Sequence, residues 1–120
     1  MSYFRDYAYC MRKGDFEKMF SFKGKEEGLR LFSLAFPYVI TRNDVDYVIG
    51  CGKDVNFKPD DEDWQQFYEL CDSCQHGVRL IYSGDFDSPE IKHFNEALST
   101  FDLELYEMIS LKVSFELPKV

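Results

Sequence analysis

The segment Asp60–Ser83 constrains the fold more than any other part of the chain. Asp60 is a good helix N-cap residue, and the acidic side chains of Asp61–Asp63 favour a helix start because they face the positive end of the helix dipole. Apolar residues then recur at helical spacing and define one buried face, formed by Trp64, Phe67, Tyr68, Cys71 and Cys74. We expect this helix to end near Gln75, and the run Val78–Ser83 to form an interior strand.

The C-terminal part of the chain carries two further patterns. Ser88, Pro89 and Glu90 are typical of a helix start, because proline at the first helical position loses no hydrogen bond. A helical stripe follows, which predicts a second helix with the buried residues Ile91, Phe94, Ala97, Leu98 and Phe101. Over Ile109–Leu117, apolar residues alternate strictly with polar ones, and this alternation predicts a half-buried strand.

The first half of the chain supplies the remaining elements. Lys25–Phe36 predicts a third helix, ended by Pro37, and Asp46–Cys51 predicts a strand. Tyr3–Met11 and Phe16–Lys23 are compatible with either type, and their aromatic residues favour strands. Together these patterns predict one α+β domain over residues 1–120, with a mixed or antiparallel sheet and about three helices.

Charge is distributed unevenly along the sequence. Between Asp60 and Glu107 there are thirteen acidic residues and two basic ones, Arg79 and Lys92. Residues 1–59 include eight acidic and ten basic residues, so their formal charge is +2. Residues 60–120 include 14 acidic and 4 basic residues, so their formal charge is −10, and the net charge of the chain is −8. The acidic residues gather in two blocks at the expected helix starts, namely Asp60, Asp61, Glu62 and Asp63, and then Asp85, Asp87 and Glu90. If both starts lie at the same edge of the sheet, they form one negative face.

A negative face excludes some partners and favours others. It repels nucleic acid and anionic membranes, and it attracts a basic protein through long-range steering. The N-terminus lacks the apolar run of a signal peptide, and the longest apolar stretch, Leu34–Ile40, is too short to cross a bilayer. We therefore expect a cytoplasmic protein with reduced cysteines and with no direct nucleic-acid or membrane partner.

Two short patterns resemble chemical motifs but lack parts that the chemistry needs. Cys71 and Cys74 have redox or zinc spacing, yet they lie at the C-terminal end of an acidic helix, where a thiolate is disfavoured, and no second ligand pair has standard spacing. The run Gly50–Lys53 resembles a phosphate loop only in part, because Asp54 stands where serine or threonine is required. We predict no catalytic residue, no metal ligand and no cofactor.

These observations favour a small acidic inhibitor, of the immunity or antitoxin type, that blocks the basic surface of a nuclease or of another toxin. Its predicted partner-binding residues are Asp60, Asp61, Glu62, Asp63, Tyr82, Asp85, Asp87 and Glu90, with Tyr82 as a packed hot spot. Three alternatives remain at this point. They are a phage-type inhibitor that mimics nucleic acid and blocks a host defence protein, a small enzyme or metal/thiol protein that uses Cys71, Cys74 and His76, and a subunit of a larger assembly.

Overall fold

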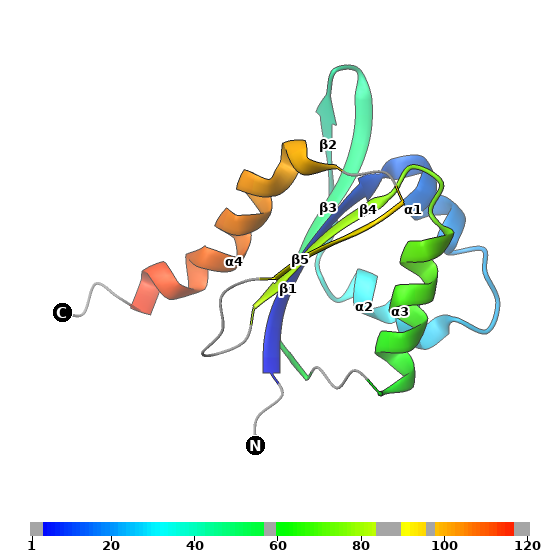
Figure 1. Cartoon of the computed structure of the whole chain (residues 1–120), viewed down its shortest axis with the longest axis horizontal. Coiled ribbons are helices and arrows are strands. Elements are labelled where there is room, and N and C mark those ends of the chain that lie inside the picture. The colour runs from blue at the N-terminus through cyan, green and yellow to red at the C-terminus, as the bar shows by residue number, and fades with distance from the viewer. Residues whose placement is uncertain (1–3, 57–59, 84–89, 96–97, 117–120) are drawn as a thin grey trace.

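The computed structural model describes residues 4–56, 60–83, 90–95 and 98–116, which form five strands and four α-helices (Figure 1). The strands are β1 (Phe4–Arg12), β2 (Tyr38–Arg42), β3 (Val45–Asn56), β4 (Val78–Ser83) and β5 (Glu90–Phe94). The helices are α1 (Lys13–Met19), α2 (Glu26–Ser33), α3 (Glu62–Ser73) and α4 (Asp102–Glu116), with a 3-10 turn, η1 (Ser99–Phe101), before α4. Within these ranges, no helix has the length and apolarity that crossing a membrane requires.

The five strands form one antiparallel sheet in the order β2-β3-β1-β4-β5. The hairpin between β2 and β3 turns at Asn43 and Asp44, which have positive φ angles of 53° and 65°. Asparagine and aspartate tolerate this conformation, which tight hairpin turns require. The predicted α+β class and antiparallel sheet are therefore confirmed.

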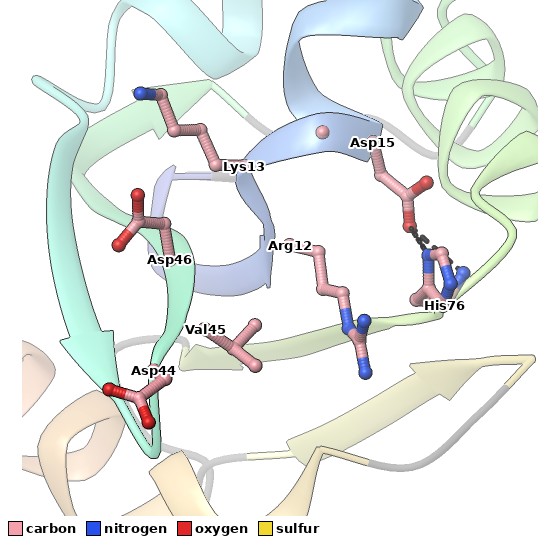
Figure 2. Close-up of a pocket in the computed structure, with 8 residues that line it drawn as sticks. Arg12, Lys13, Asp15, Asp44, Val45, Asp46 and His76 are labelled. Carbon is pink, nitrogen blue, oxygen red and sulfur yellow. Dashed lines mark hydrogen bonds and ion pairs between the residues drawn. The ribbon is translucent and has the colours of Figure 1, made fainter.

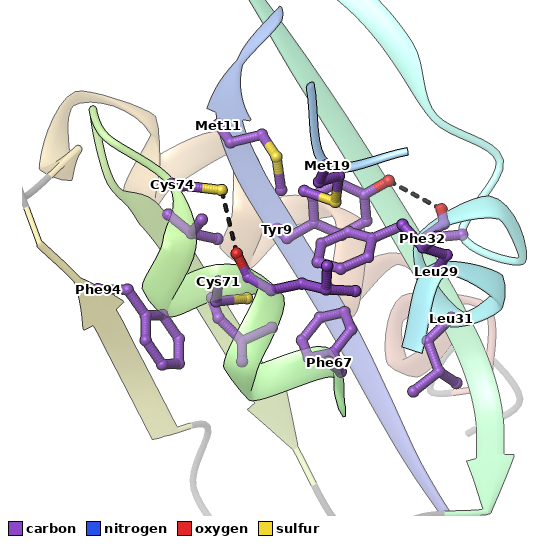
Figure 3. Close-up of a cluster of buried hydrophobic side chains, with 14 of the residues drawn as sticks. Tyr9, Met11, Met19, Leu29, Leu31, Phe32, Phe67, Cys71, Cys74 and Phe94 are labelled. Atoms are coloured by element: carbon purple, nitrogen blue, oxygen red, sulfur yellow. Dashed lines mark hydrogen bonds between the residues drawn. The ribbon is translucent and has the colours of Figure 1, made fainter. Parts of the chain in front are cut away.

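The two faces of the sheet bury side chains of different sizes. Along β1, Tyr7, Tyr9 and Met11 lie on one face and Ala8 and Cys10 on the other, and all five are at most 1% exposed. Residues of α1, α2 and α3 cover the tyrosine face and form the larger core cluster (Figure 3). Helix α4 covers the opposite face, where the small side chains of β1 leave room for Phe101, Leu105 and Ile109.

Two tyrosine–glycine pairs join β1, β3 and α2. In the ladder between β1 and β3, Tyr7 stands opposite Gly52 and Tyr9 opposite Gly50. A Cβ at either glycine would press on the paired tyrosine ring, so each ring needs the bare backbone beside it. The Tyr7 hydroxyl donates a hydrogen bond to the carbonyl of Leu31, and that of Tyr9 donates to Phe32 (2.8 Å). These carbonyls lie in the last turn of α2, where no intrahelical donor is available. The glycines of the run Gly50–Lys53 thus have a packing role in β3.

Helices α2 and α3 touch backbone to backbone at Gly28. A Cβ at Gly28 would lie 2.7 Å from the backbone carbon of Gln66 and 2.7 Å from the nitrogen of Phe67. The Gly28 N–H, in the first turn of α2, donates to the Gln66 side-chain oxygen (3.0 Å). Gln66 is 7% exposed, so the close approach of the helices also satisfies two buried polar groups.

Basic side chains from three strands hold α4 against the sheet. Arg79 of β4 makes a two-pronged ion pair with Asp102, with both N–O distances at 2.8 Å. Arg42 of β2 pairs with Glu104 at 2.7 Å and lies 4.5 Å from the centre of the Phe101 ring. Lys53 of β3 donates to the backbone carbonyl of Met108. The N-terminal part of α4 is therefore tied to three strands at once.

The strands expected at Tyr3–Met11, Asp46–Cys51 and Val78–Ser83 correspond to β1, β3 and β4, and the helices expected at Lys25–Phe36 and Asp60–Gln75 correspond to α2 and α3. The structure begins α3 at Glu62, with Asp61 as the N-cap residue in place of Asp60. In the two helices, the hydrophobic period matches the buried face, whereas β1 buries side chains on both faces of the sheet.

Two predictions in the C-terminal part are wrong. The helix expected after Ser88 is replaced, from Glu90 to Phe94, by the edge strand β5. Pairing with β4 gives hydrogen-bond partners to backbone groups of that strand's edge. This stabilisation by residues distant in sequence outweighs the helical spacing of the apolar residues.

The strand expected over Ile109–Leu117 is also wrong: as far as Glu116, these residues belong to helix α4. Helix α4 buries Leu105 and Ile109, four residues apart, and does not use the alternating pattern. Ser88, Pro89, Ala97 and Leu117 lie outside the described residues.

The strand expected at Phe16–Lys23 is also wrong, because Lys13–Met19 forms helix α1. Phe16 and Met19 are three residues apart and both pack on the tyrosine face of the sheet. Aromatic content is a poor guide here: a helix turn brings residues three apart to one face, whereas a strand would send these two side chains to opposite faces.

The close contact at Gly28 predicts opposite effects for the same substitution in two helices. Gly28→Ala should lower the free energy of unfolding by about 1–3 kcal/mol, because the new methyl group meets the backbone of α3. Gly14→Ala in α1 meets nothing within 4 Å, so it should be neutral or should raise the stability by up to about 1 kcal/mol. Urea unfolding of both variants checks this. Equal effects of the two substitutions would contradict the packing described for α2 and α3.

Candidate functional site

The acidic start of α3, which comprises Asp60, Asp61, Glu62 and Asp63, is largely open to solvent. The first three residues are exposed and Asp63 is half-buried. The Asp63 carboxylate accepts a hydrogen bond from the backbone N–H of Trp64 (2.7 Å), and that of Glu62 accepts one from Gln66 (3.1 Å). The Asp61 side chain makes no capping hydrogen bond. No basic residue that the structure describes forms an ion pair with any of the four.

The topology brings the start of α3 to the same end of the sheet as the end of β4 and the beginning of β5 (Figure 1). Strand β3 ends at Asn56, opposite the beginning of β1, and α3 starts six residues later. Strand β4 ends and β5 begins at the same end, because Tyr82 pairs with Tyr7 and with Glu90. Asp85 and Asp87, the other predicted contact residues, lie outside the described residues.

A group of four residues, Arg5, Tyr68, Tyr82 and Glu90, surrounds this end of β4; we call it the tyrosine group. Tyr82 is half-buried, and burial raises the pKa of its phenol; hydrogen bonding to Glu90 raises it further. Arg5 lies 5.8 Å from the centre of the Tyr82 ring and opposes this rise. Burial also raises the pKa of Tyr68, whose ring carries the ammonium of Lys92 at 4.4 Å. Tyr82 is therefore already engaged by neighbours and shows only part of its surface.

The contacts of the basic side chains at this end, Arg5 with Tyr82 and Lys92 with Tyr68, were not predicted from the sequence. Arg5 is distant in sequence from the acidic blocks, and only strand pairing between β1 and β4 brings it beside Tyr82. Lys92 was noted in sequence, but its contact with Tyr68 depends on β5 being a strand next to β4. Arg5 and Lys92 thus place positive charge near Tyr82 and Tyr68, at the end of β4 where Glu90 lies.

Several other acidic residues of the C-terminal half are neutralised by bases. Arg79 pairs with Asp102 and Arg42 with Glu104, as described for α4. Lys25 pairs with Glu69 in the middle of α3 (3.0 Å). Lys25 and Arg42 of the N-terminal half thus pair with acids on α3 and α4, whereas no described base pairs with the acidic start of α3. Such a surface can bind cationic groups by charge and by accepting hydrogen bonds.

The cysteines singled out by their spacing are core residues. Cys71 and Cys74 are buried in the larger core cluster, and the Cys74 thiol donates to the carbonyl of Leu70 at 3.4 Å (Figure 3). Burial raises the pKa of Cys71 well above its usual range and that of Cys74 to about 12. In the part of the chain that the structure describes, no group of three or more His, Cys, Asp or Glu side chains is arranged to hold a metal ion. Both thiols are therefore protonated at neutral pH, a state unsuited to nucleophilic or redox chemistry.

Comparisons of the chain with protein-family models, with curated proteins and with solved structures found no match. The functional reading therefore rests on the geometry and charge described above.

The buried thiols predict slow chemical modification. We expect Cys10, Cys71 and Cys74 to react with a disulfide reagent at pH 8 no faster than the protein unfolds, because they are buried and protonated. Half-buried Cys51 should react first. Mass spectrometry of the labelled protein identifies the order, and all four thiols should react at once in urea. A fast reaction of native Cys71 or Cys74 would instead favour thiol chemistry.

The same shifts predict a loss of stability at high pH. The pKa values of Cys10 and Cys74 rise from 9.0 to about 12 in the folded protein. Below pH 9 the thiols are protonated in both the folded and the unfolded protein, so they do not reduce the free energy of unfolding. Between pH 9 and pH 12 the thiols of the unfolded protein lose their protons first, and this lowers the free energy of unfolding. Burial raises the pKa of Tyr7 and Tyr9 as well, which acts in the same direction. Urea midpoints should therefore fall between pH 8 and pH 11, and a constant midpoint would contradict the burial of these groups.

Proposed function

We propose that this protein is an acidic binding protein of the immunity or antitoxin type, which blocks a basic surface on a nuclease or on another toxin. The observation that carries the proposal is the acidic start of α3, with four carboxylates and no described basic partner. Three other acidic residues on these helices, Glu69 on α3 and Asp102 and Glu104 on α4, are paired with bases within the fold, whereas no described base pairs with these four.

Electrostatics favours a protein partner over nucleic acid. A nuclease needs a cationic cleft to hold phosphates, and carboxylates presented on a rigid helix start can occupy that cleft in their place. Charge of this kind speeds association and selects among partners more than it adds to affinity. The tyrosine group at the same end of the sheet supplies aromatic surface that a partner can pack against. In this role Asp60, Asp61 and Glu62 act as steering and contact residues.

Reversal of charge at the acidic start of α3 provides the test. In Asp60→Lys with Asp61→Lys, neither replaced side chain makes a contact that the fold requires. We expect the double variant to keep its fold and to lose the partner, which should associate with the wild type quickly at low salt and more slowly as salt rises. The measurement is capture of partners from a lysate of the source organism at low salt, followed by inhibition assays with each purified basic partner.

A matched control carries the same change of net charge at another place. Asp72→Lys with Glu107→Lys replaces two exposed acids on α3 and α4, away from the acidic start. It should capture and inhibit the same partner as the wild type. If both double variants behave alike, net charge alone governs the binding and the acidic start is not the contact surface. If Asp60→Lys with Asp61→Lys inhibits as well as the wild type, the proposal is wrong.

A further inference from the structure

A cavity of about 400 Å³ lies at the other end of the sheet from the acidic start of α3 (Figure 2). It is bounded by the end of β1, the start of α1, the hairpin between β2 and β3, and the segment that leads into β4. Arg12, the last residue of β1, lies in its middle, with Asp15 and His76 on one side and Asp44 and Asp46 on the other (Figure 2). The volume is in the range of sites that bind small molecules.

Arg12 is the exceptional arginine of the chain. Arg30, Arg42 and Arg79 each form an ion pair with a carboxylate, and Arg5 lies over Tyr82. The side chain of Arg12 makes no hydrogen bond, ion pair or ring contact with any described residue, although the protein carries 22 acidic residues. Its Nε atom is nevertheless buried and has no hydrogen-bond acceptor. A buried donor of a charged group without an acceptor costs stability, so a group that accepts a hydrogen bond from this atom would stabilise the protein.

The nearby carboxylates do not supply that acceptor. Asp15, which is 7% exposed, accepts a hydrogen bond from the backbone N–H of His76 (2.9 Å) and lies 3.4 Å from the Nδ1 atom of that histidine. Asp46 accepts a hydrogen bond from the hydroxyl of Thr41 (2.6 Å). Both acids thus have other hydrogen-bond partners, and neither pairs with the guanidinium of Arg12, which lies in the middle of the lining (Figure 2).

We propose that this cavity binds a small molecule through an oxyanion, a phosphate or a carboxylate, that pairs with the guanidinium of Arg12. The fork of donors on arginine matches two oxygens of either group, and the pair would give the buried Nε its acceptor. Lys13 also lines the cavity, on the side of Asp46 and with its ammonium directed away from Arg12 (Figure 2). Asp44, exposed on the hairpin turn, is an acceptor for hydroxyl or amino groups elsewhere on the ligand. This site is separate from the proposed protein contact at the acidic start of α3.

The wild-type protein allows a direct test by NMR. Inorganic phosphate and acetate are titrated separately into the full chain, and the Nε–H signal of Arg12 is followed together with that of Arg30. We expect a saturable shift at Arg12 and none at Arg30, because Arg30 is exposed and already paired with Glu27. The anion with the lower dissociation constant identifies the group as phosphate or carboxylate. Absence of a saturable shift at Arg12 with both anions, up to tens of millimolar, overturns the proposal.

Variants separate binding from a structural role. Arg12→Met should weaken binding of the preferred anion at least tenfold, and Arg30→Met should leave it unchanged. Without anion, Arg12→Met should unfold at the same urea concentration as the wild type or at a higher one, because it removes a donor that has no acceptor. If that variant does not fold, Arg12→Gln takes its place in both measurements. Tight anion binding that survives the loss of Arg12 would contradict the assignment.

Discussion

The fold depends on two tyrosines of the central strand that reach across a neighbouring strand to the end of a helix. Tyr7 and Tyr9 pass beside Gly52 and Gly50 and donate hydrogen bonds to the last turn of α2. The glycines make room, the rings fill the larger core cluster, and the hydroxyls satisfy carbonyls that the helix itself leaves open. Strand order, helix position and polar satisfaction are therefore fixed by one set of contacts, and the other elements pack around it.

Sequence patterns predicted those elements whose own period matches the surface that they bury. The apolar stripe from Trp64 to Cys74 is of this kind, and the short β-rich run Val78–Ser83 was predicted from its composition as an interior strand. The failures arose where contacts distant in sequence decide the structure. Glu90–Phe94 forms a strand because the edge of β4 is available for pairing. Helix α4 buries Leu105 and Ile109, which are four residues apart, although the apolar residues from Ile109 onward alternate with polar ones. Likewise, the acidic start of α3 was visible in the sequence, whereas Arg5 beside Tyr82 and the unpaired Arg12 were not, because strand pairing brings their surroundings together.

The charged residues divide into those that hold the fold and those left free to interact. Arg42 and Arg79 neutralise acids of α4, and Lys25 neutralises one on α3. Among the described residues without such a pair are the carboxylates at the start of α3, at one end of the sheet, and the guanidinium of Arg12, at the other. Both lie where chain segments meet at the ends of the strands, which is where a rigid sheet leaves side chains free for binding.

Helix α4 has a further consequence for the sheet that it covers. Through Arg42, Lys53 and Arg79 it is attached to β2, β3 and β4, so a single helix links strands that are not all neighbours. A mechanical force that slides one of these strands past another must break these attachments as well as the ladder hydrogen bonds. The contacts of α4 thus oppose sliding of the strands in addition to the hydrogen bonds between the strands. A change of strand register would require α4 to detach from the sheet.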